Sequence, residues 1–384
     1  MPQIVAFTGL RRVGKTTLMR KIVEDYIKNN FGNKKILYFS FDEYKEEKIV
    51  SVIKEYEDIS GFDLRKEKVL FLLDEIQKVK DWENQIKILY DTYKPNIKFI
   101  ISGSETLFIR RKSKETLAGR IFEFKIEPLT FKEFLKFKNQ EYRPIGIYMK
   151  TLRKLFNDYI HIQGFPELID VQDYELINKY IKEGIIEKII FRDIQESEKI
   201  NDIAVVHSLL NIIINKPGQI IEITDISNQL GISRQTISIY LKYLEDAFLI
   251  KKLYNFSKSR RKVERKLKKY YPSIISPDLA FRNDNLSKSK IFEWFVVIQI
   301  NAEFFWKDSY KNEVDVIIFN KAIIPVEIKY GKIETNGLEK FMEKFHIEKG
   351  YIMSYEDEEI INKNNIIIKV IPAFKYFLDD EKAF

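Results

Sequence analysis

Cysteine is absent from the 384 residues, and histidine occurs only three times. Disulfides and thiolate metal sites are therefore excluded, and a zinc site is not expected from His161, His207 and His346, which are isolated from one another. No apolar run approaches the roughly 18 residues that a membrane span requires. The N-terminal stretch MPQIVAFTG has neither a basic start nor a cleavage site. These absences predict a soluble, cytoplasmic protein without a membrane partner.

Neither sign of charge dominates strongly, because 65 Lys and Arg stand against 57 Asp and Glu, a net charge of +8. Such an excess matters for function only where it is concentrated on one face. The chain is longer than the roughly 100 to 200 residues of a single domain. We therefore expect more than one domain.

A glycine-rich stretch, GLRRVGKTT at residues 9–17, follows the apolar segment QIVAF and precedes a segment of helical periodicity. Strand, loop and helix form the context of a phosphate-binding loop. Gly9 and Gly14 let backbone amides approach phosphate oxygens, and the helix N-terminus favours negative charge. Lys15 should contact the β- and γ-phosphates of ATP, and the Thr16 hydroxyl should ligate Mg²⁺. The predicted nucleotide-binding residues of the loop are Gly9, Arg12, Gly14, Lys15, Thr16 and Thr17.

Two adjacent carboxylates follow a second apolar segment, KVLFLLDEIQ, which is typical of a buried parallel strand. Asp74 is predicted to hold Mg²⁺, and Glu75 to act as the catalytic base that polarises the attacking water. This division of roles indicates hydrolysis, since a small-molecule kinase uses its substrate as the nucleophile. The alternative is a solvated acidic turn after a core strand.

A third apolar segment, IKFIISGSE, ends in Ser102 and Ser104. Either hydroxyl could contact the γ-phosphate, but polar residues at strand ends are also ordinary turn chemistry. The residues alone leave both interpretations open.

A helix-turn-helix is predicted in the middle of the chain. Residues 149–198 have a helical pattern interrupted by the turn GFPE, and we expect them to form a lid on the ATPase core. In the segment that follows, Gly231 ends one short helix and Ser233 caps the next. The apolar residues of the second helix, which recur at spacings of three and four, are Ile237, Leu241, Leu244 and Phe248. The residues expected to face outward, toward nucleic acid, are Arg234, Gln235, Ser238 and Lys242.

A basic run, SKSRRKVERKLKKYY, comes directly after this helix. A basic wing beside a recognition helix is typical of proteins that bind double-stranded DNA. Its predicted contact residues are Arg260, Arg261 and Lys262, and the run also contains Lys258, Arg265, Lys266, Lys268 and Lys269. The alternative is a spacer or protein-binding module with a solvated loop.

Three carboxylates and a lysine are predicted to meet near the C-terminus. The apolar helix IFEWFVVIQI carries Glu293, whose buried charge requires a partner such as a metal ion. Two apolar strands joined by a turn at residues 320–321 place Asp315 opposite Glu327, which shares a face with Lys329. The carboxylates could bind Mg²⁺ and orient a water, and the lysine could stabilise charge on a phosphate. The alternative is an exposed ion pair on a hairpin, whose Pro325 predicts an edge or a bulge.

The ordered motifs GLRRVGKTT, LFLLDEIQ, IISGSE and LAGRIFEFKIEPLTFKEFL resemble those of archaeal and bacterial AAA+ ATPases with a C-terminal restriction-endonuclease-like domain. The resemblance implies that Ser102 or Ser104 is a sensor. It also implies that Arg120 is a catalytic cation, acting within the chain or from a neighbouring subunit of a homo-oligomer. Members of that family usually have a few dozen residues before the first strand, so the contacts to the base stay unassigned.

We therefore expect an α/β protein of four parts. These are a P-loop AAA+ parallel sheet (residues 1–140), a helical lid (141–200), a winged helix-turn-helix (201–276) and a PD-(D/E)xK nuclease-like α/β domain (277–384). The expected function is Mg²⁺-dependent ATP hydrolysis coupled to DNA binding and metal-dependent DNA cleavage, with Asp315, Glu327 and Lys329 as catalytic residues. The alternative is a nucleotide-controlled DNA- or protein-binding module whose nuclease-like domain is inactive. A small-molecule phosphotransferase is a weaker option.

Overall fold

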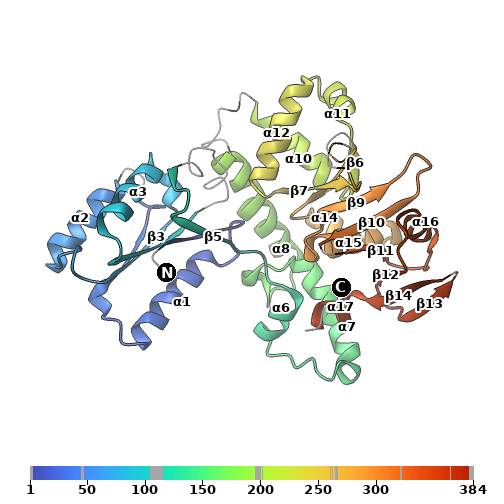
Figure 1. Ribbon diagram of the computed structural model, residues 1–384, viewed down its shortest axis with the longest axis horizontal. Helices are drawn as coiled ribbons and strands as arrows, with labels where there is room; N and C mark the ends of the chain where they lie inside the picture. Colours follow the sequence, from blue (N-terminus) through green and yellow to red (C-terminus); the bar gives the residue numbers. More distant parts are fainter. Residues whose placement is uncertain are drawn as a thin grey trace. The chain divides into compact units, whose positions relative to one another are not determined.

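The computed structural model describes residues 3–44, 47–103, 116–194, 200, 202–259, 261, 263, 267–320, 322–363 and 365–379. The chain forms two compact units (Figure 1). One is Met1–Pro128 with Glu196–Glu198, and the other comprises Leu129–Gln195 and Lys199–Phe384. Of the residues predicted to be functional, Ser104, Arg260 and Lys262 lie outside the described ranges.

A five-stranded parallel sheet of order β2-β3-β4-β1-β5 forms the centre of the first unit, which confirms the predicted α/β architecture. Its strands are β1 (Ile4–Thr8), β2 (Ile36–Ser40), β3 (Val69–Asp74), β4 (Ile97–Ser102) and β5 (Ile121–Lys125). The helices are α1 (Lys15–Lys28), α2 (Ile49–Ser60) and α3 (Trp82–Tyr93), with short 3₁₀ turns at Asn33–Lys35 and Ile76–Lys78.

Strand β3 shows why this sheet is covered on both faces. All of its residues are buried, and successive side chains point to opposite faces. Phe71 and Leu73 pack in a cluster with residues of α2 and α3, whereas Leu70 and Leu72 pack with Met19 of α1. Burial on both faces explains the continuous apolar run in the sequence.

The parallel arrangement also sets where the functional side chains lie. Because all five strands run in one direction, their carboxyl ends share one edge of the sheet. Phe7 of β1 is in register with Ser102 of β4, and Leu73 of β3 is in register with Ile101. The loop after β1 and the ends of β3 and β4 are therefore neighbours.

A nine-stranded sheet of order β13-β14-β12-β11-β10-β9-β7-β8-β6 runs through the second unit. Its strands are β6 (Gln219–Ile221), β7 (Ile250–Asn255), β8 (Lys268–Pro272), β9 (Phe304–Lys307), β10 (Glu313–Phe319), β11 (Ile323–Lys329), β12 (Lys349–Ser354), β13 (Glu359–Lys363) and β14 (Ile366–Pro372). Parallel pairing of Tyr254 and Asn255 with Phe304 and Phe305 joins β7 to β9. The Asn255 side chain reinforces this junction through hydrogen bonds with the backbone of Lys307. Strands on both sides of the boundary predicted at residues 276–277 thus pair in one sheet.

Helices precede and flank these strands. They are α6 (Phe131–Phe137), α7 (Ile145–Ile162), α8 (Tyr174–Ile181), α10 (Ile203–Ile214), α11 (Ile223–Leu230), α12 (Arg234–Asp246), α14 (Pro277–Ala280), α15 (Asn285–Gln299), α16 (Asn336–Phe345) and α17 (Ala373–Leu378). A 3₁₀ turn covers Pro166–Leu168, and π-helical turns cover Lys182–Glu187 and Ile189–Ile194. In the part of the chain that the structure describes, every helix is too short or too polar to cross a bilayer.

The helices predicted to form a lid belong to the second unit. Phe156 of α7 makes edge-on contacts with Phe295 of α15 and packs near Phe374 of α17. Gln163, in the turn before GFPE, uses its side-chain amide to donate to and accept from the backbone of Ile275. The two compact units divide after Pro128, and the division into four domains stays a prediction.

Candidate functional site

The loop after β1 has the backbone that its glycines predict. Gly9 has a φ of 140° and Gly14 a φ of 98°. A Cβ atom at Gly9 would lie 2.1 Å from the carbonyl oxygen of Ile126, so only glycine fits there. Lys15 begins α1 and is 6% exposed, and its ammonium donates to the carbonyls of Gly9 and Leu10 at 2.8 and 2.9 Å. The loop is thus closed around a buried cation, while Arg12 and Thr17 are exposed.

Asp74, at the end of β3, lies at the centre of a polar cluster to which β2, β4 and α1 also contribute. Its carboxylate accepts hydrogen bonds from Thr16 at 2.7 Å and from Tyr38 at 2.8 Å, both at Oδ2. Ser102 of β4 donates to the other oxygen. Burial and the charge of Asp74 raise the pKa of Tyr38 to about 12, so the phenol stays a donor.

Oxygen ligands of this kind suit Mg²⁺, which prefers carboxylates, hydroxyls and water. The Thr16 and Asp74 oxygens are already within 2.7 Å of each other. This spacing matches two neighbouring positions of an octahedral shell. The residues present therefore fit the predicted metal, and Thr16 and Asp74 are the side chains that would hold it.

Glu75 follows directly, in a left-handed backbone conformation with a φ of 54°. Such a conformation is unusual for a residue with a side chain and is often found at functional sites. The Glu75 amide donates to Asp74, and its carboxylate accepts a hydrogen bond from Gln77 at 2.6 Å. Glu75 is therefore held next to Asp74, but its own carboxylate makes a separate hydrogen bond.

Arg120 lies at the amino ends of the strands, opposite the end that carries the phosphate loop. Its carbonyl accepts from the amide of Ile4, at the start of β1. Four residues of extended strand, about 13 Å, separate this point from the phosphate loop. The guanidinium is also paired with both oxygens of Asp91 on α3. The Arg120 guanidinium is thus engaged away from the phosphate loop of its own chain, and its catalytic role stays a prediction.

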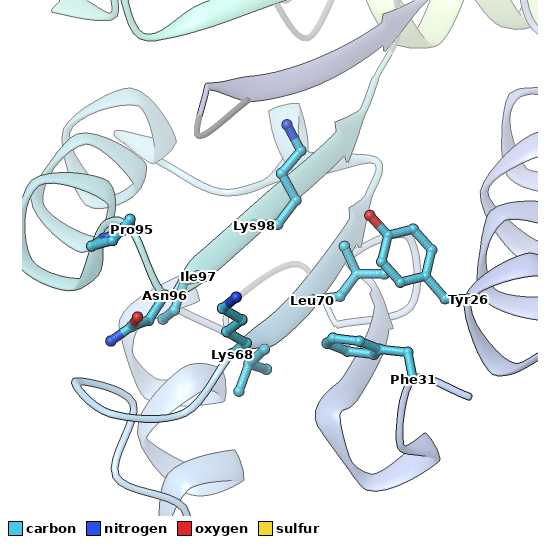
Figure 2. Close-up of a pocket in the computed structure, with 9 residues that line it drawn as sticks. Tyr26, Phe31, Lys68, Leu70, Pro95, Asn96, Ile97 and Lys98 are labelled. Carbon is cyan, nitrogen blue, oxygen red and sulfur yellow. The ribbon is translucent and has the colours of Figure 1, made fainter. Parts of the chain in front are cut away.

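A pocket of about 570 Å³ opens at the amino ends of the strands (Figure 2). It is lined by Tyr26, Phe31, Lys68 and Lys98, among others, where β3 and β4 begin. Because the phosphate loop follows the end of β1, this pocket is separate from the nucleotide site.

The C-terminal carboxylates come together much as the hairpin predicts. Val316 pairs with Val326, so the next pair of the same register is Asp315 and Glu327. Asp315 sits at an irregularity in the pairing with β9 and accepts from the amide of Ile328 at 3.0 Å. Strand β11 is interior rather than an edge, but its pairing with β12 begins at Val326, just after Pro325.

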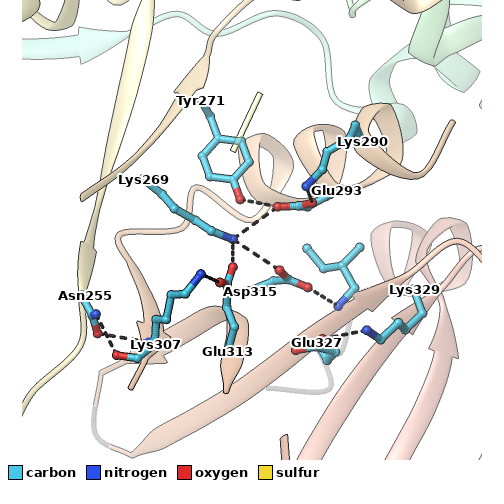
Figure 3. A network of polar contacts seen from close by, with 11 residues as sticks. Asn255, Lys269, Tyr271, Lys290, Glu293, Lys307, Glu313, Asp315, Glu327 and Lys329 are labelled. Carbon is cyan, nitrogen blue, oxygen red and sulfur yellow. Dashed lines mark hydrogen bonds and ion pairs between the residues drawn. The ribbon is translucent and has the colours of Figure 1, made fainter. Parts of the chain in front are cut away.

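Lys269 of β8 provides an ammonium at the centre of this acidic cluster (Figure 3). Its Nζ is 3.5 Å from Glu293 Oε1 and 3.5 Å from Asp315 Oδ1, and it also pairs with Glu313. The side chain is only 3% exposed. Tyr271 of the same strand donates to Glu293 at 2.7 Å. The partners of the buried Glu293 are therefore Lys269, Tyr271 and Lys290, whose Nζ lies 2.7 Å from Glu293 Oε2.

This finding corrects the prediction for the basic run, which assigned Lys269 to a solvent-facing wing. Lys268 is half-buried and Lys269 is buried, whereas Lys258 and Arg261 are exposed. Sequence reasoning missed Lys269, Tyr271 and Glu313 as members of the cluster. The spacing of Glu313 and Asp315, two residues apart on a strand, was a usable signal because such residues share a face.

Burial and neighbouring charge perturb the titration of the cluster. Burial, together with Asp315, raises the pKa of Glu327 to about 8, and burial with Glu293 raises the pKa of Asp315. Burial would lower the pKa of Lys269, but the surrounding negative groups raise it well above its usual range. Lys329 contacts Glu327 Oε1 at 2.9 Å. Among the described residues, Glu327 Oε2 is buried without a hydrogen-bond partner.

The cluster does not fit the predicted Mg²⁺ as it is arranged. Glu293 and Asp315 already share the Lys269 ammonium, and burial together with Asp315 raises the pKa of Glu327, which disfavours its charged form. Within the described ranges, no set of three or more acidic or histidine side chains is grouped so that it could hold a metal ion. Glu327 Oε2, which has no hydrogen-bond partner among the described residues, would supply only one ligand, whereas a divalent cation needs several.

The predicted recognition helix is α12. Ser233 caps it by accepting from the amide of Thr236 at 3.1 Å, and Gly231 ends α11 with a φ of 67°. Ile237, Leu241 and Leu244 are buried. The four residues predicted to face outward, Arg234, Gln235, Ser238 and Lys242, are all exposed. Strand β6 precedes α11, strands β7 and β8 follow α12, and the three pair antiparallel in the order β6-β8-β7.

Relatives of known sequence match most of the chain. The uncharacterized protein MJ1544 of Methanocaldococcus jannaschii is 29% identical, over 98% of this chain and 88% of the relative. The uncharacterized protein MJ1637 of the same organism is 28% identical, over 92% of this chain and 81% of the relative. Among solved structures, the Aeropyrum pernix ORC1 protein in complex with DNA has a TM-score of 0.34 and 12% identity, over 73% of this chain and 86% of that one.

Family profiles match three successive segments. Residues 153–273 match a domain of unknown function (DUF8612), and residues 290–376 match another (DUF4143). The third match covers the parallel sheet, the glycine-rich loop and the Asp74 cluster. Residues 1–135 match the family described as an AAA domain.

Proposed function

We propose that the first unit binds ATP with Mg²⁺ and hydrolyses it, and that the nucleotide state controls the contacts of the second unit with double-stranded DNA. One observation carries the proposal. The Thr16 hydroxyl and the Asp74 carboxylate meet at 2.7 Å beside a loop that only glycine can form. An AAA domain in residues 1–135 is consistent with it.

Each residue of the site has a distinct role in this proposal. The loop amides and the N-terminus of α1 bind phosphate oxygens. The Lys15 ammonium, which donates to the carbonyls of Gly9 and Leu10 in this structure, donates to phosphate oxygens when the nucleotide is bound. Mg²⁺, when bound, neutralises charge on the phosphates. Glu75 accepts a proton from the attacking water, and Ser102 keeps Asp74 oriented.

Exposed polar residues on α12 support a DNA interface. The order of helices α10 to α12 and strands β6, β7 and β8 is consistent with a winged helix, and Arg234 and Lys242 are exposed on α12. The segment with Arg260, Arg261 and Lys262 connects β7 and β8 and adds positive charge. Lysine and arginine at such positions neutralise phosphates and release counterions.

The acidic cluster favours the alternative function for the C-terminal part. A nuclease of the predicted kind needs its carboxylates free to bind a divalent cation. Here the Lys269 ammonium already pairs with Glu293 and Asp315. We therefore assign residues 277–384 a binding or structural role, so that ATP turnover is the chemistry of this chain.

The decisive experiment is the ATPase rate of wild type and Lys15→Ala, each with and without duplex DNA. We expect turnover in wild type, stimulation by DNA, and a loss of about 100-fold or more in the variant, as when a charge-stabilising donor is removed. Lys21→Ala is the matched control, because Lys21 is an exposed residue of the same helix paired only with Glu24 in the described contacts. Turnover in Lys15→Ala equal to wild type would contradict the proposal.

Binding to DNA has its own test, which is independent of hydrolysis. Lys242→Ala should weaken binding to duplexes of any sequence and reduce the salt dependence by about one phosphate contact. Lys349→Ala, an exposed lysine of β12, should change neither quantity. If both variants bind like wild type, α12 is not the DNA-facing helix.

A further inference from the structure

We propose that Lys269 is a built-in replacement for a divalent cation. Its ammonium occupies the centre of the C-terminal acidic cluster and anchors β8 to the neighbouring part of the sheet. The native cluster therefore holds no metal ion, and removal of the lysine is expected to let its carboxylates rearrange around one. The inference concerns the second unit alone and does not depend on ATP turnover.

Three carboxylates from two different elements converge on the Lys269 Nζ. Glu293 comes from α15, whereas Glu313 and Asp315 come from β10. Convergence of carboxylates from a helix and a strand on one point is the geometry by which proteins bind hard cations. A lysine ammonium supplies one positive charge and three donors at that point.

The Lys269 side chain has little freedom to leave. Its backbone pairs with Leu253 of β7 on one side and with Ile220 of β6 on the other. The ammonium also lies 5.5 Å from the centre of the Phe305 ring. Moving it to solvent would expose unpaired buried carboxylates, which is strongly unfavourable.

Charge within the cluster is balanced. Each of its four carboxylates is paired with at least one of four lysines (Figure 3). The carboxylates are Glu293, Glu313, Asp315 and Glu327, and the lysines are Lys269, Lys290, Lys307 and Lys329. Because each carboxylate already has a lysine partner, a divalent cation gains little by entering.

Access to the cluster is also closed on the Glu293 side. Gly218, in the turn before β6, lies so near that a Cβ atom there would be 2.8 Å from Glu293 Oε1. The Tyr271 hydroxyl lies 2.7 Å from the same oxygen. The turn and the tyrosine leave no room for a further group beside this oxygen of Glu293.

Binding of Mn²⁺, followed by electron paramagnetic resonance on the nucleotide-free full chain, tests the proposal. Four proteins are compared: wild type, Asp315→Asn, Lys269→Met and the double variant Lys269→Met/Asp315→Asn. All four retain Thr16 and Asp74, so any Mn²⁺ bound in the first unit contributes equally to each. Methionine removes the ammonium and keeps most of the side-chain volume.

We expect wild type and Asp315→Asn to bind the same number of Mn²⁺ ions. Lys269→Met should bind one more per chain, and the double variant should lose it. If Lys269→Met does not fold in metal-free buffer, millimolar Mn²⁺ should restore its folded circular dichroism spectrum.

Two results would overturn the proposal. One is wild type binding an additional Mn²⁺ that Asp315→Asn lacks, because a metal would then displace the lysine. The other is a Lys269→Met variant that binds no additional Mn²⁺, folded or during refolding, because Lys269 would then not stand in a metal position.

Discussion

The ammonium of Lys269, on β8, lies 3.5 Å from the carboxylate of Asp315, on β10. The contact joins the strands that follow the α11–α12 pair to the C-terminal hairpin. Because β7 and β9 also pair directly, the two regions share one sheet and one ion network. The second unit is therefore expected to respond to mutation as a whole.

Removal of the Lys269 charge should destabilise this unit. Lys269→Ala leaves Glu293 and Asp315 without their shared cation, and breaking a buried ion pair on one side costs about 3–5 kcal/mol. The measurement is the shift in the urea unfolding midpoint followed by tryptophan fluorescence. Lys268→Ala, at the half-buried neighbouring position of the same strand, should shift the midpoint much less. Equal shifts would mean that the network is not the source of the stability.

Glu75→Gln should separate nucleotide binding from hydrolysis. The amide cannot accept a proton from water, so turnover should fall by about 100-fold or more. Asp74 and Thr16 are unchanged, so affinity for ATP with Mg²⁺ should stay within about threefold of wild type. Phosphate release and binding of a fluorescent ATP analogue measure the two effects. A parallel loss of affinity would assign Glu75 to binding rather than to proton transfer.

Gly9→Ala should abolish nucleotide binding by a steric effect. The new Cβ atom would lie 2.1 Å from the Ile126 carbonyl oxygen, so the loop must move away from β5. Gly61→Ala is the matched control, since Gly61 also has a positive φ, of 70°, but no heavy atom within 4 Å of an added Cβ. The control should lose about 1 kcal/mol of stability and still bind ATP. Retention of binding in Gly9→Ala would show that the loop tolerates displacement.

Arg120 can be tested for action between subunits by mixing two inactive variants. Arg120 is too far from its own phosphate loop, so it contributes only if a neighbouring chain presents it. Lys15→Ala and Arg120→Ala should each be inactive, and their mixture should recover part of the ATPase rate. Asp91→Ala, which frees Arg120 from its ion pair, should remain active. Full activity of Arg120→Ala alone would reduce Arg120 to a structural residue.

Local motifs explain why much of the nucleotide site was predictable from the sequence. Gly9, Lys15 and Thr16 are close in the chain, and their roles follow from a strand, a tight loop and a helix start that short-range interactions specify. The uninterrupted apolar run of β3 likewise specifies a strand buried on both faces. Apolar spacing and the Ser233 cap predicted α12 in the same way.

The amino-acid sequence by itself determined the glycine-rich loop, the buried strand ending in Asp74 and the exposed face of α12, because each depends on neighbours only a few residues away. Only the tertiary structure decided that Lys269 points into the acidic cluster and that Arg120 lies at the amino ends of the strands, away from the phosphate loop. Strand order and pairing between distant segments set those two positions, and neither is encoded in local periodicity. The same physical reason explains how a basic residue predicted to lie in a solvent-facing wing is instead the buried cation of the acidic cluster.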